Sequence, residues 1–271
     1  MQGVRYTDLE ALRVKIAALE SRPLLAGSAL APRAAEGLLP LPAGTLSEVF
    51  ADEPRDSGAA LGFALGLARG QLTPRRPAVL ILQLANQAQE MGVPYGAGLS
   101  HFGLDPARVV LARPAGIVEL LWALEEAMAC RAVAAVVADI GSTHKALDFT
   151  ASRRLSLRAN GAGTSALLIR YGRAREASAA KYRWRVVPAA SGPRPFDPRA
   201  PGSPRWQAVL EKGRLRPGQP VSAQGEEYFL EWTTHGFGLA DLGQQAAAAD
   251  GRPPLSRPQP AALGNGLSQA S

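Results

Sequence analysis

The chain has 271 residues, 46% hydrophobic and 20% charged, which is the ordinary composition of a soluble globular protein and enough for one large domain with tails. No apolar run approaches the roughly 18 residues that a bilayer-spanning helix needs, so a membrane-spanning class is excluded. The net charge is +7 and all but four of the 30 basic residues are arginine, which suits phosphate or carboxylate partners, although a GC-rich coding bias explains the same excess.

The N-terminal segment, residues 1–37, is expected to form an amphipathic helix followed by a linker. Residues 7–10, Thr-Asp-Leu-Glu, form a capping box, and the predicted helix spans residues 8–21. Its apolar stripe consists of Leu9, Leu12, Ile16 and Leu19. The stripe must be buried either on its own domain or on a neighbouring molecule, so it is a candidate partner contact. The charged residues of this segment argue against a secretory signal peptide.

Residues 38–235 are expected to form an α/β domain, because apolar strands alternate with amphipathic helices. The predicted strands are residues 46–51, 79–84, 109–112, 133–139 and 165–170, and the predicted helices are residues 57–69, 117–130 and 147–159. Continuous apolar strands between helices predict a mainly parallel sheet with helices on both faces. The single cysteine, Cys130, excludes an internal disulfide and favours a reducing cytoplasm.

The pattern changes after residue 170. Residues 181–187 alternate with period two, as a half-exposed strand does, and residues 206–210 and 228–232 are two further strands. We therefore predict an antiparallel extension at the C-terminal edge of the sheet. Residues 236–271 are rich in Ala, Gln, Pro and Gly, which predicts a disordered tail apart from a short motif at residues 237–242.

The first strand, loop and helix of the domain have the order of a P-loop, in which a helix N-terminus holds phosphates. The lysine that meets the phosphates is replaced by Ala59 and the Mg²⁺-binding hydroxyl by Ala60, and the first glycine by Glu53, which would repel an anion. We predict a degenerate phosphate loop with no nucleotide or other cofactor. This loop comprises Glu53, Arg55, Ser57, Gly58, Ala59 and Ala60.

Asp139 ends the apolar strand of residues 133–139, where an ATPase carries the Walker B aspartate that organises Mg²⁺. The alternative is a structural aspartate that caps the following turn, and the missing lysine and hydroxyl favour this role. His, Cys and carboxylate residues nowhere show the spacing of metal ligands, so we predict no metal site.

A basic region follows the predicted helix of residues 147–159. Its members are Arg153, Arg154, Arg158, Arg170, Arg173, Arg175, Lys181, Arg183 and Arg185. These side chains are candidates for contact with DNA or a partner protein, and the alternative is a solvated helix face and strand face. The interleaved Tyr182 and Trp184 have the chemistry to stack on bases, but their alternation predicts that they face the core.

Several separate segments of residues 38–233 resemble the RecA core and, within that group, the ImuA family of bacterial damage-induced mutagenesis cassettes. The segments are residues 41–51, 62–68, 103–108, 121–127, 147–157 and 178–186. The resemblance implies a cytoplasmic accessory protein of SOS-induced error-prone translesion synthesis. Its implied partners are ImuB, a polymerase homologue, and an error-prone replicative-type polymerase, while contact with RecA and with single-stranded DNA stays open.

This sequence departs from the RecA pattern in ways that predict a non-catalytic scaffold. The catalytic glutamate expected after the second strand is missing from residues 85–87, and the loops that would hold single-stranded DNA, residues 141–146 and 171–180, are short. Two alternatives stay open. One is an active DNA-dependent ATPase in which Arg55 replaces the lysine, and the other is an SOS-linked inhibitor of cell division.

Overall fold

The computed structural model describes residues 41–192, 200–215 and 225–240, together with the single residues 14, 39, 194 and 197. The predicted stripe of Leu9, Leu12, Ile16 and Leu19 lies outside the described residues, and so does the predicted tail from residue 241 onward.

A mixed sheet runs through the described part of residues 41–240. Its strands are β1 (Leu46–Ala51), β2 (Ala78–Gln83), β3 (Val109–Ala112), β4 (Val133–Gly141), β5 (Ser165–Tyr171), β6 (Tyr182–Ala189), β7 (Arg205–Lys212), β8 (Glu226–Thr233) and β9 (Gly236–Leu239). They lie in the order β3-β2-β4-β5-β1-β6-β7-β8-β9. Strands β1 to β6 pair in parallel, and β7, β8 and β9 each pair antiparallel with the strand before. The predicted α/β fold with a mostly parallel sheet and an antiparallel C-terminal edge is confirmed.

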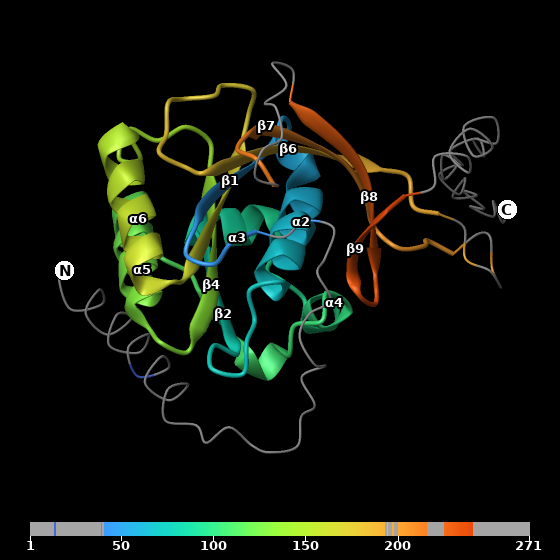
Figure 1. Ribbon diagram of the computed structural model, residues 1–271, viewed down its shortest axis with the longest axis horizontal. Helices are drawn as coiled ribbons and strands as arrows, with labels where there is room; N and C mark the ends of the chain where they lie inside the picture. Colours follow the sequence, from blue (N-terminus) through green and yellow to red (C-terminus); the bar gives the residue numbers. More distant parts are fainter. Residues whose placement is uncertain are drawn as a thin grey trace, which may run out of the picture. The chain divides into compact units, whose positions relative to one another are not determined.

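Helices cover the parallel part of the sheet on both faces (Figure 1). They are α2 (Ser57–Arg69), α3 (Ala85–Met91), α4 (Gly96–His101), α5 (Ile117–Ala129) and α6 (Phe149–Ala162), with the short 3-10 helices η1 (Pro54–Asp56) and η2 (Pro106–Arg108). Helices α5 and α6 enclose one apolar cluster and α2 encloses the other. None of the helices described has the length and apolar character to cross a membrane.

The ends of α6 are set by its flanking residues. The Asp148 carboxylate accepts a hydrogen bond of 2.7 Å from the backbone N–H of Ala151, which makes Asp148 the N-cap. At the other end Gly163 adopts the left-handed conformation (φ 68°) that closes many helices. The helix therefore starts two residues later and ends three residues later than the predicted range of 147–159.

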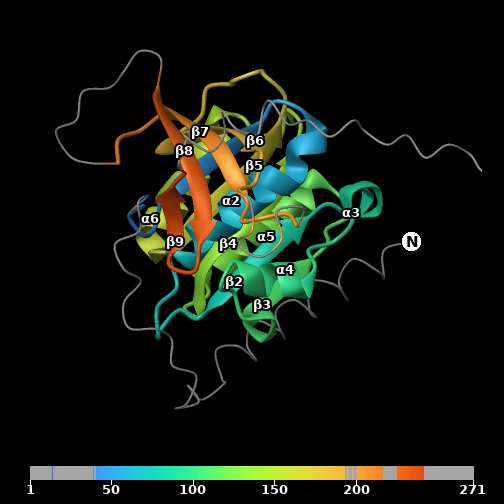
Figure 2. The ribbon, with the colours of Figure 1, turned by 90° about the vertical axis from the view of Figure 1, so that its right-hand side faces the viewer.

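The antiparallel extension packs against α2 through aromatic rings, and two glycines of α2 make room for them. A Cβ on Gly62 would lie 3.3 Å from Trp206 of β7 and 2.9 Å from Phe102, which follows α4. One on Gly66 would lie 2.5 Å from Phe237 and 2.8 Å from Trp232. Figure 2 shows β8 and β9 lying across α2. The close approach of this helix to the rings therefore depends on the missing side chains.

Gly66→Ala is expected to lower the free energy of unfolding by about 1–2 kcal/mol. The new methyl group would clash with the aromatic rings, and this cost exceeds the gain in helix propensity from glycine to alanine. Gly58→Ala is the matched control in the same helix, since an added Cβ meets nothing within 4 Å there, and it should stabilise by up to about 1 kcal/mol. Urea unfolding followed by circular dichroism measures both. Equal effects at the two positions would contradict the packing described.

The boundary predicted at residue 236 is wrong for the first four residues of the predicted tail. Gly236–Leu239 forms β9, paired with β8. Phe237 explains this, because its ring lies 5.1 Å from that of Phe63 and 5.2 Å from that of Trp232. One aromatic anchor thus extends the sheet into a segment whose composition resembles a linker.

Candidate functional site

The predicted phosphate loop lies at the carboxyl end of β1 and leads through η1 into α2, so the strand–loop–helix order is confirmed. Glu53 precedes η1 and is partly exposed, Arg55 and Gly58 are exposed, and Ser57 begins α2. The position of the missing lysine, Ala59, has its backbone carbonyl engaged by the Trp206 indole N–H at 2.9 Å. The start of α2 is thus held by a side chain of the antiparallel extension.

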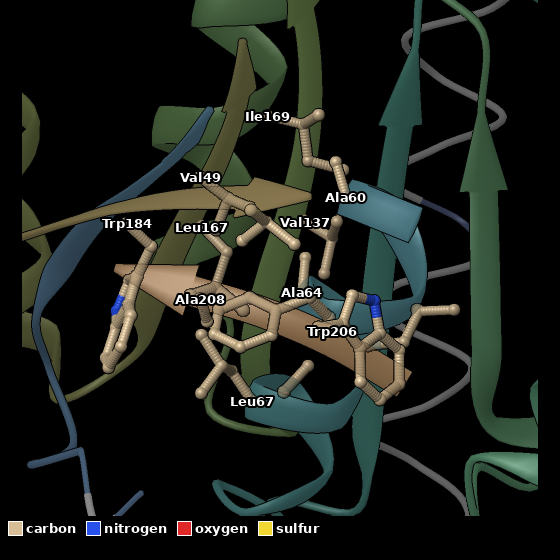
Figure 3. Packing of buried hydrophobic residues seen from close by; sticks show 14 of the residues in the cluster. Val49, Ala60, Ala64, Leu67, Val137, Leu167, Ile169, Trp184, Trp206 and Ala208 are labelled. Atoms are coloured by element: carbon tan, nitrogen blue, oxygen red, sulfur yellow. The ribbon is translucent and has the colours of Figure 1, made fainter. Parts of the chain in front are cut away.

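Ala60, at the position of the Mg²⁺-binding hydroxyl, is fully buried. It belongs to the apolar cluster under α2 and lies beside Val137 and Ile169 (Figure 3). Because apolar side chains surround it, this position faces the sheet core. At the two positions where a P-loop carries its lysine and its Mg²⁺-binding hydroxyl, α2 therefore offers neither group to a phosphate.

The carboxylates of the loop are held by arginines from the segment that follows β5. Arg175 contacts Asp52 and Glu211 at 2.9 and 2.8 Å and lies 4.2 Å from the centroid of the Phe50 ring. Arg173, which is largely exposed, lies 3.9 Å from Glu53. These pairs neutralise acidic side chains where a phosphate-binding loop would present positive charge.

Asp139 is placed near the end of β4 and is 8% exposed. The Tyr171 hydroxyl donates to its Oδ2 at 2.9 Å, and the backbone N–H of Gly141 donates to its Oδ1 at 3.2 Å. Burial raises the pKa of Asp139 to about 6, partly offset by these hydrogen bonds, and burial beside this carboxyl raises the pKa of Tyr171 as well. Both carboxyl oxygens have protein donors, which favours the structural role over magnesium binding.

Asp139→Asn is expected to become more stable relative to the unsubstituted protein as the pH rises from 4 to 8. The pKa of Asp139 is about 6 in the folded state, above the ordinary value of 3.8. The protonated carboxyl therefore stabilises the fold fully only at pH values below 3.8, and this stabilisation is lost as the pH rises through 6. The difference in unfolding free energy should change by about 2–2.5 kcal/mol over this range. Denaturant unfolding at several pH values measures it, and a pH-independent difference would contradict the burial of the charge.

A buried ionic cluster lies on the opposite face of the sheet from α2, and the sequence did not indicate it. Glu48 on β1 is 1% exposed, and its carboxylate contacts Arg170 of β5 at 3.3 Å and Arg183 of β6 at 2.8 Å. The Ser178 hydroxyl donates to the same carboxylate at 2.8 Å, and Glu176 contacts Arg170 at 2.8 Å. The sequence feature that could have indicated this cluster is a charged residue inside each of two apolar strands, Glu48 in β1 and Arg170 in β5.

The structure does not gather the predicted basic residues into one surface. Arg170 is 2% exposed, so the prediction that it contacts DNA or a partner is wrong, because the side chain neutralises Glu48. Arg183 is also mostly buried. Tyr182 and Trp184 are 2% and 0% exposed, which confirms that they face the core.

The remaining basic residues lie on α6, on β6 and in the segment between β5 and β6. Arg154 and Arg158 of α6 lie 2.7 and 3.9 Å from Glu125 and Glu126 of α5, and Arg185 lies 3.8 Å from Glu211. Arg153 and Lys181 are exposed. Contact of this set with DNA or a partner stays a prediction.

Among the described residues, no group of three or more His, Cys, Asp or Glu side chains is placed to hold a metal ion.

Two curated proteins are similar to this chain. Each is named Protein ImuA and comes from Caulobacter vibrioides, one from strain NA1000 / CB15N and the other from strain ATCC 19089 / CIP 103742 / CB 15. Each is 34% identical over 178 residues, which cover 62% of this chain and 68% of the relative. No family model matches the chain.

Proposed function

Because the chain belongs to the ImuA family, we propose that it is a non-catalytic, RecA-like accessory protein of SOS-induced error-prone translesion synthesis. In this role it recruits an ImuB-like polymerase homologue and an error-prone replicative-type polymerase in the cytoplasm. It contributes binding surfaces and no phosphate chemistry.

Three features support a RecA-like core. The strand β1, the loop and the helix α2 follow one another in the P-loop order. Asp139 stands near the end of a buried parallel strand, and antiparallel strands close one edge of the sheet. The same architecture serves many activities, so the function has to be argued from the loop itself.

The observation that carries the non-catalytic role is the burial of Ala60 at the start of α2. A working loop presents a lysine and a hydroxyl there, and each stabilises charge on the transferred phosphoryl group. Here the two positions are alanines, one of them sealed in the core, and the neighbouring carboxylates are bound to arginines. A scaffold needs only the surrounding surface, which this fold retains.

The test is damage-induced mutagenesis in a strain that lacks the gene. The unsubstituted protein should restore mutation frequency and co-purify with the ImuB-like partner. Asp139→Asn and Arg55→Ala should do both equally well, because neither residue acts on a nucleotide. Unchanged mutation frequency on deletion, together with failure to co-purify, would contradict the proposal.

Two other outcomes separate the alternatives. The ATPase alternative rests on Arg55, which is exposed on η1. It predicts that folded Arg55→Ala protein loses complementation and that DNA-stimulated phosphate release disappears. The division-inhibitor alternative predicts elongated cells on overproduction without damage, with mutation frequency unchanged.

A further inference from the structure

The outer face of α6 carries two large apolar side chains that the core does not use. The inner face of the helix packs on the sheet through side chains that are 0–6% exposed, Ala151, Leu155 and Ala159. Away from the sheet, Phe149 is 49% exposed and Leu157 is 64% exposed. Exposed apolar side chains that share one face of a helix mark a contact surface more often than scattered ones do.

Arg153 lies between these two apolar side chains. Positions 149, 153 and 157 follow one another at a spacing of four, so their side chains form one stripe about 12 Å long on a helix. Arg153 is exposed, and it makes no ion pair with any described residue. We call Phe149, Arg153 and Leu157 the α6 stripe. It offers one cation with an apolar group on each side.

The carboxylates around the α6 stripe already have partners, where α6 stands beside α5 (Figure 1). Those of α5 and of residues 142–162 are each held by an arginine of α6 or by a backbone N–H, and they are Glu119, Glu125, Glu126 and Asp148. Lys145, just before α6, is exposed and, like Arg153, has no carboxylate partner among the described residues. The charge left for a partner on this surface is therefore positive, and its complement is negative.

A helix of a partner protein can match this pattern. On a helix, a carboxylate with an apolar residue four positions before it and another four positions after it forms a stripe of the same length. Such a helix covers Phe149 and Leu157 and pairs its acid with Arg153. Nucleic acid fits less well, because its phosphates would leave the two apolar side chains in water and would meet the carboxylates of α5.

We propose that the α6 stripe binds an acidic amphipathic helix of the polymerase homologue that this chain recruits. The helix places a carboxylate against Arg153 and apolar side chains on Phe149 and Leu157. Val118 of α5, which is 71% exposed, extends the contact, since it lies on the same side of α5 as Glu125, seven residues later, which contacts α6. The inference rests on the proposed function, because it takes that protein as the partner.

Binding of the full-length chain to the purified ImuB-like partner tests the assignment, with affinities measured by biolayer interferometry. Leu157→Asp and Arg153→Glu should each weaken binding at least about tenfold, because one removes an apolar contact and the other repels the acid. Arg153→Lys keeps the positive charge and should retain binding.

Two matched controls lie on other elements. Leu239→Asp replaces an apolar side chain that is 70% exposed on β9, and Arg113→Glu reverses an exposed cation after β3. Both should leave the affinity unchanged. All of the substituted side chains are exposed, so circular dichroism and thermal unfolding should show the same folded state in every variant.

The outcomes separate this proposal from the proposed function. Equal losses for the stripe variants and the controls, or unchanged affinity of both Leu157→Asp and Arg153→Glu, would overturn the proposal and leave the recruitment of this partner intact. No binding by the unsubstituted protein would contradict the proposed function itself, and this inference with it. Loss of single-stranded DNA binding in Arg153→Glu, with unchanged partner binding, would assign the stripe to nucleic acid instead.

Photo-crosslinking identifies what covers the α6 stripe. Benzoylphenylalanine at position 157 of the full-length chain should crosslink to the partner, and mass spectrometry should place the bond in a segment with Asp or Glu between apolar residues at helical spacing. The same group at position 239 should give no such product. Crosslinks from position 157 only to residues 8–21 of the same chain, or only to a second copy, would overturn the proposal.

Discussion

Replacing Glu48 with alanine is expected to lower the free energy of unfolding by about 3–5 kcal/mol, because it removes the buried carboxylate that Arg170 and Arg183 share and leaves Arg170 with Glu176 alone. Arg170 is 2% exposed, so water cannot replace Glu48 there without a rearrangement of the sheet. Chemical denaturation monitored by circular dichroism gives the difference between the two proteins.

Two further variants separate charge pairing from other effects. The double substitution Glu48→Gln with Arg170→Met should recover part of the loss, since it removes one buried charge of each sign and keeps a side-chain oxygen that can accept a hydrogen bond from Arg183. Glu90→Ala, at an exposed position of α3, should change stability by less than about 0.5 kcal/mol. A loss below about 1 kcal/mol for Glu48→Ala would contradict a buried ionic cluster.

Trp206→Ala is expected to cost about 3–5 kcal/mol, because the side chain is 2% exposed and fills the space between α2 and the antiparallel extension. Trp206→Phe keeps a ring there but loses the hydrogen bond to the Ala59 carbonyl, worth about 1 kcal/mol, along with some packing. Thermal and denaturant unfolding of the two variants measure these effects.

Hydrogen exchange can also show which part of the structure loses stability in these variants. Amide hydrogen exchange should increase in the first turn of α2 in both variants, since Trp206 holds Ala59. Exchange unchanged at α2 in Trp206→Ala would mean that the antiparallel extension does not support the degenerate loop.

The sequence predicts the parallel core well, because its signals are local. Residues 46–51, 57–69 and 109–112 were predicted with the bounds observed. Each is a short apolar run or an amphipathic helix with clear flanking residues. The antiparallel edge is also confirmed, since period-two alternation indicates a sheet with one buried face.

The features that were missed depend on contacts between distant residues. Strand β9 exists because Phe237 meets the rings around Gly66, and its composition alone resembles a linker. The pairing of Glu48 with Arg170 follows from the position of β1 beside β5, which no local pattern encodes. Helices α3 and α4 are too short to give a clear periodicity.

The features of the candidate site also fall into two kinds, those that the local sequence shows and those that depend on contacts between distant residues. The missing lysine and hydroxyl can be read directly from Ala59 and Ala60. The ion pair of Arg175 with Asp52 and the hydrogen bond of Tyr171 to Asp139 require the three-dimensional arrangement. Two carboxylates of the loop, Asp52 and Glu53, therefore already have arginine partners.

We propose that the loop before α2 holds no nucleotide, and isothermal titration of the full-length protein with ATP and Mg²⁺ is the sharpest test of this proposal. We expect no saturable heat up to millimolar ATP, with or without single-stranded DNA, and the same result for Arg55→Ala. Saturable binding in the micromolar range that disappears in Arg55→Ala would show that the loop still binds nucleotide.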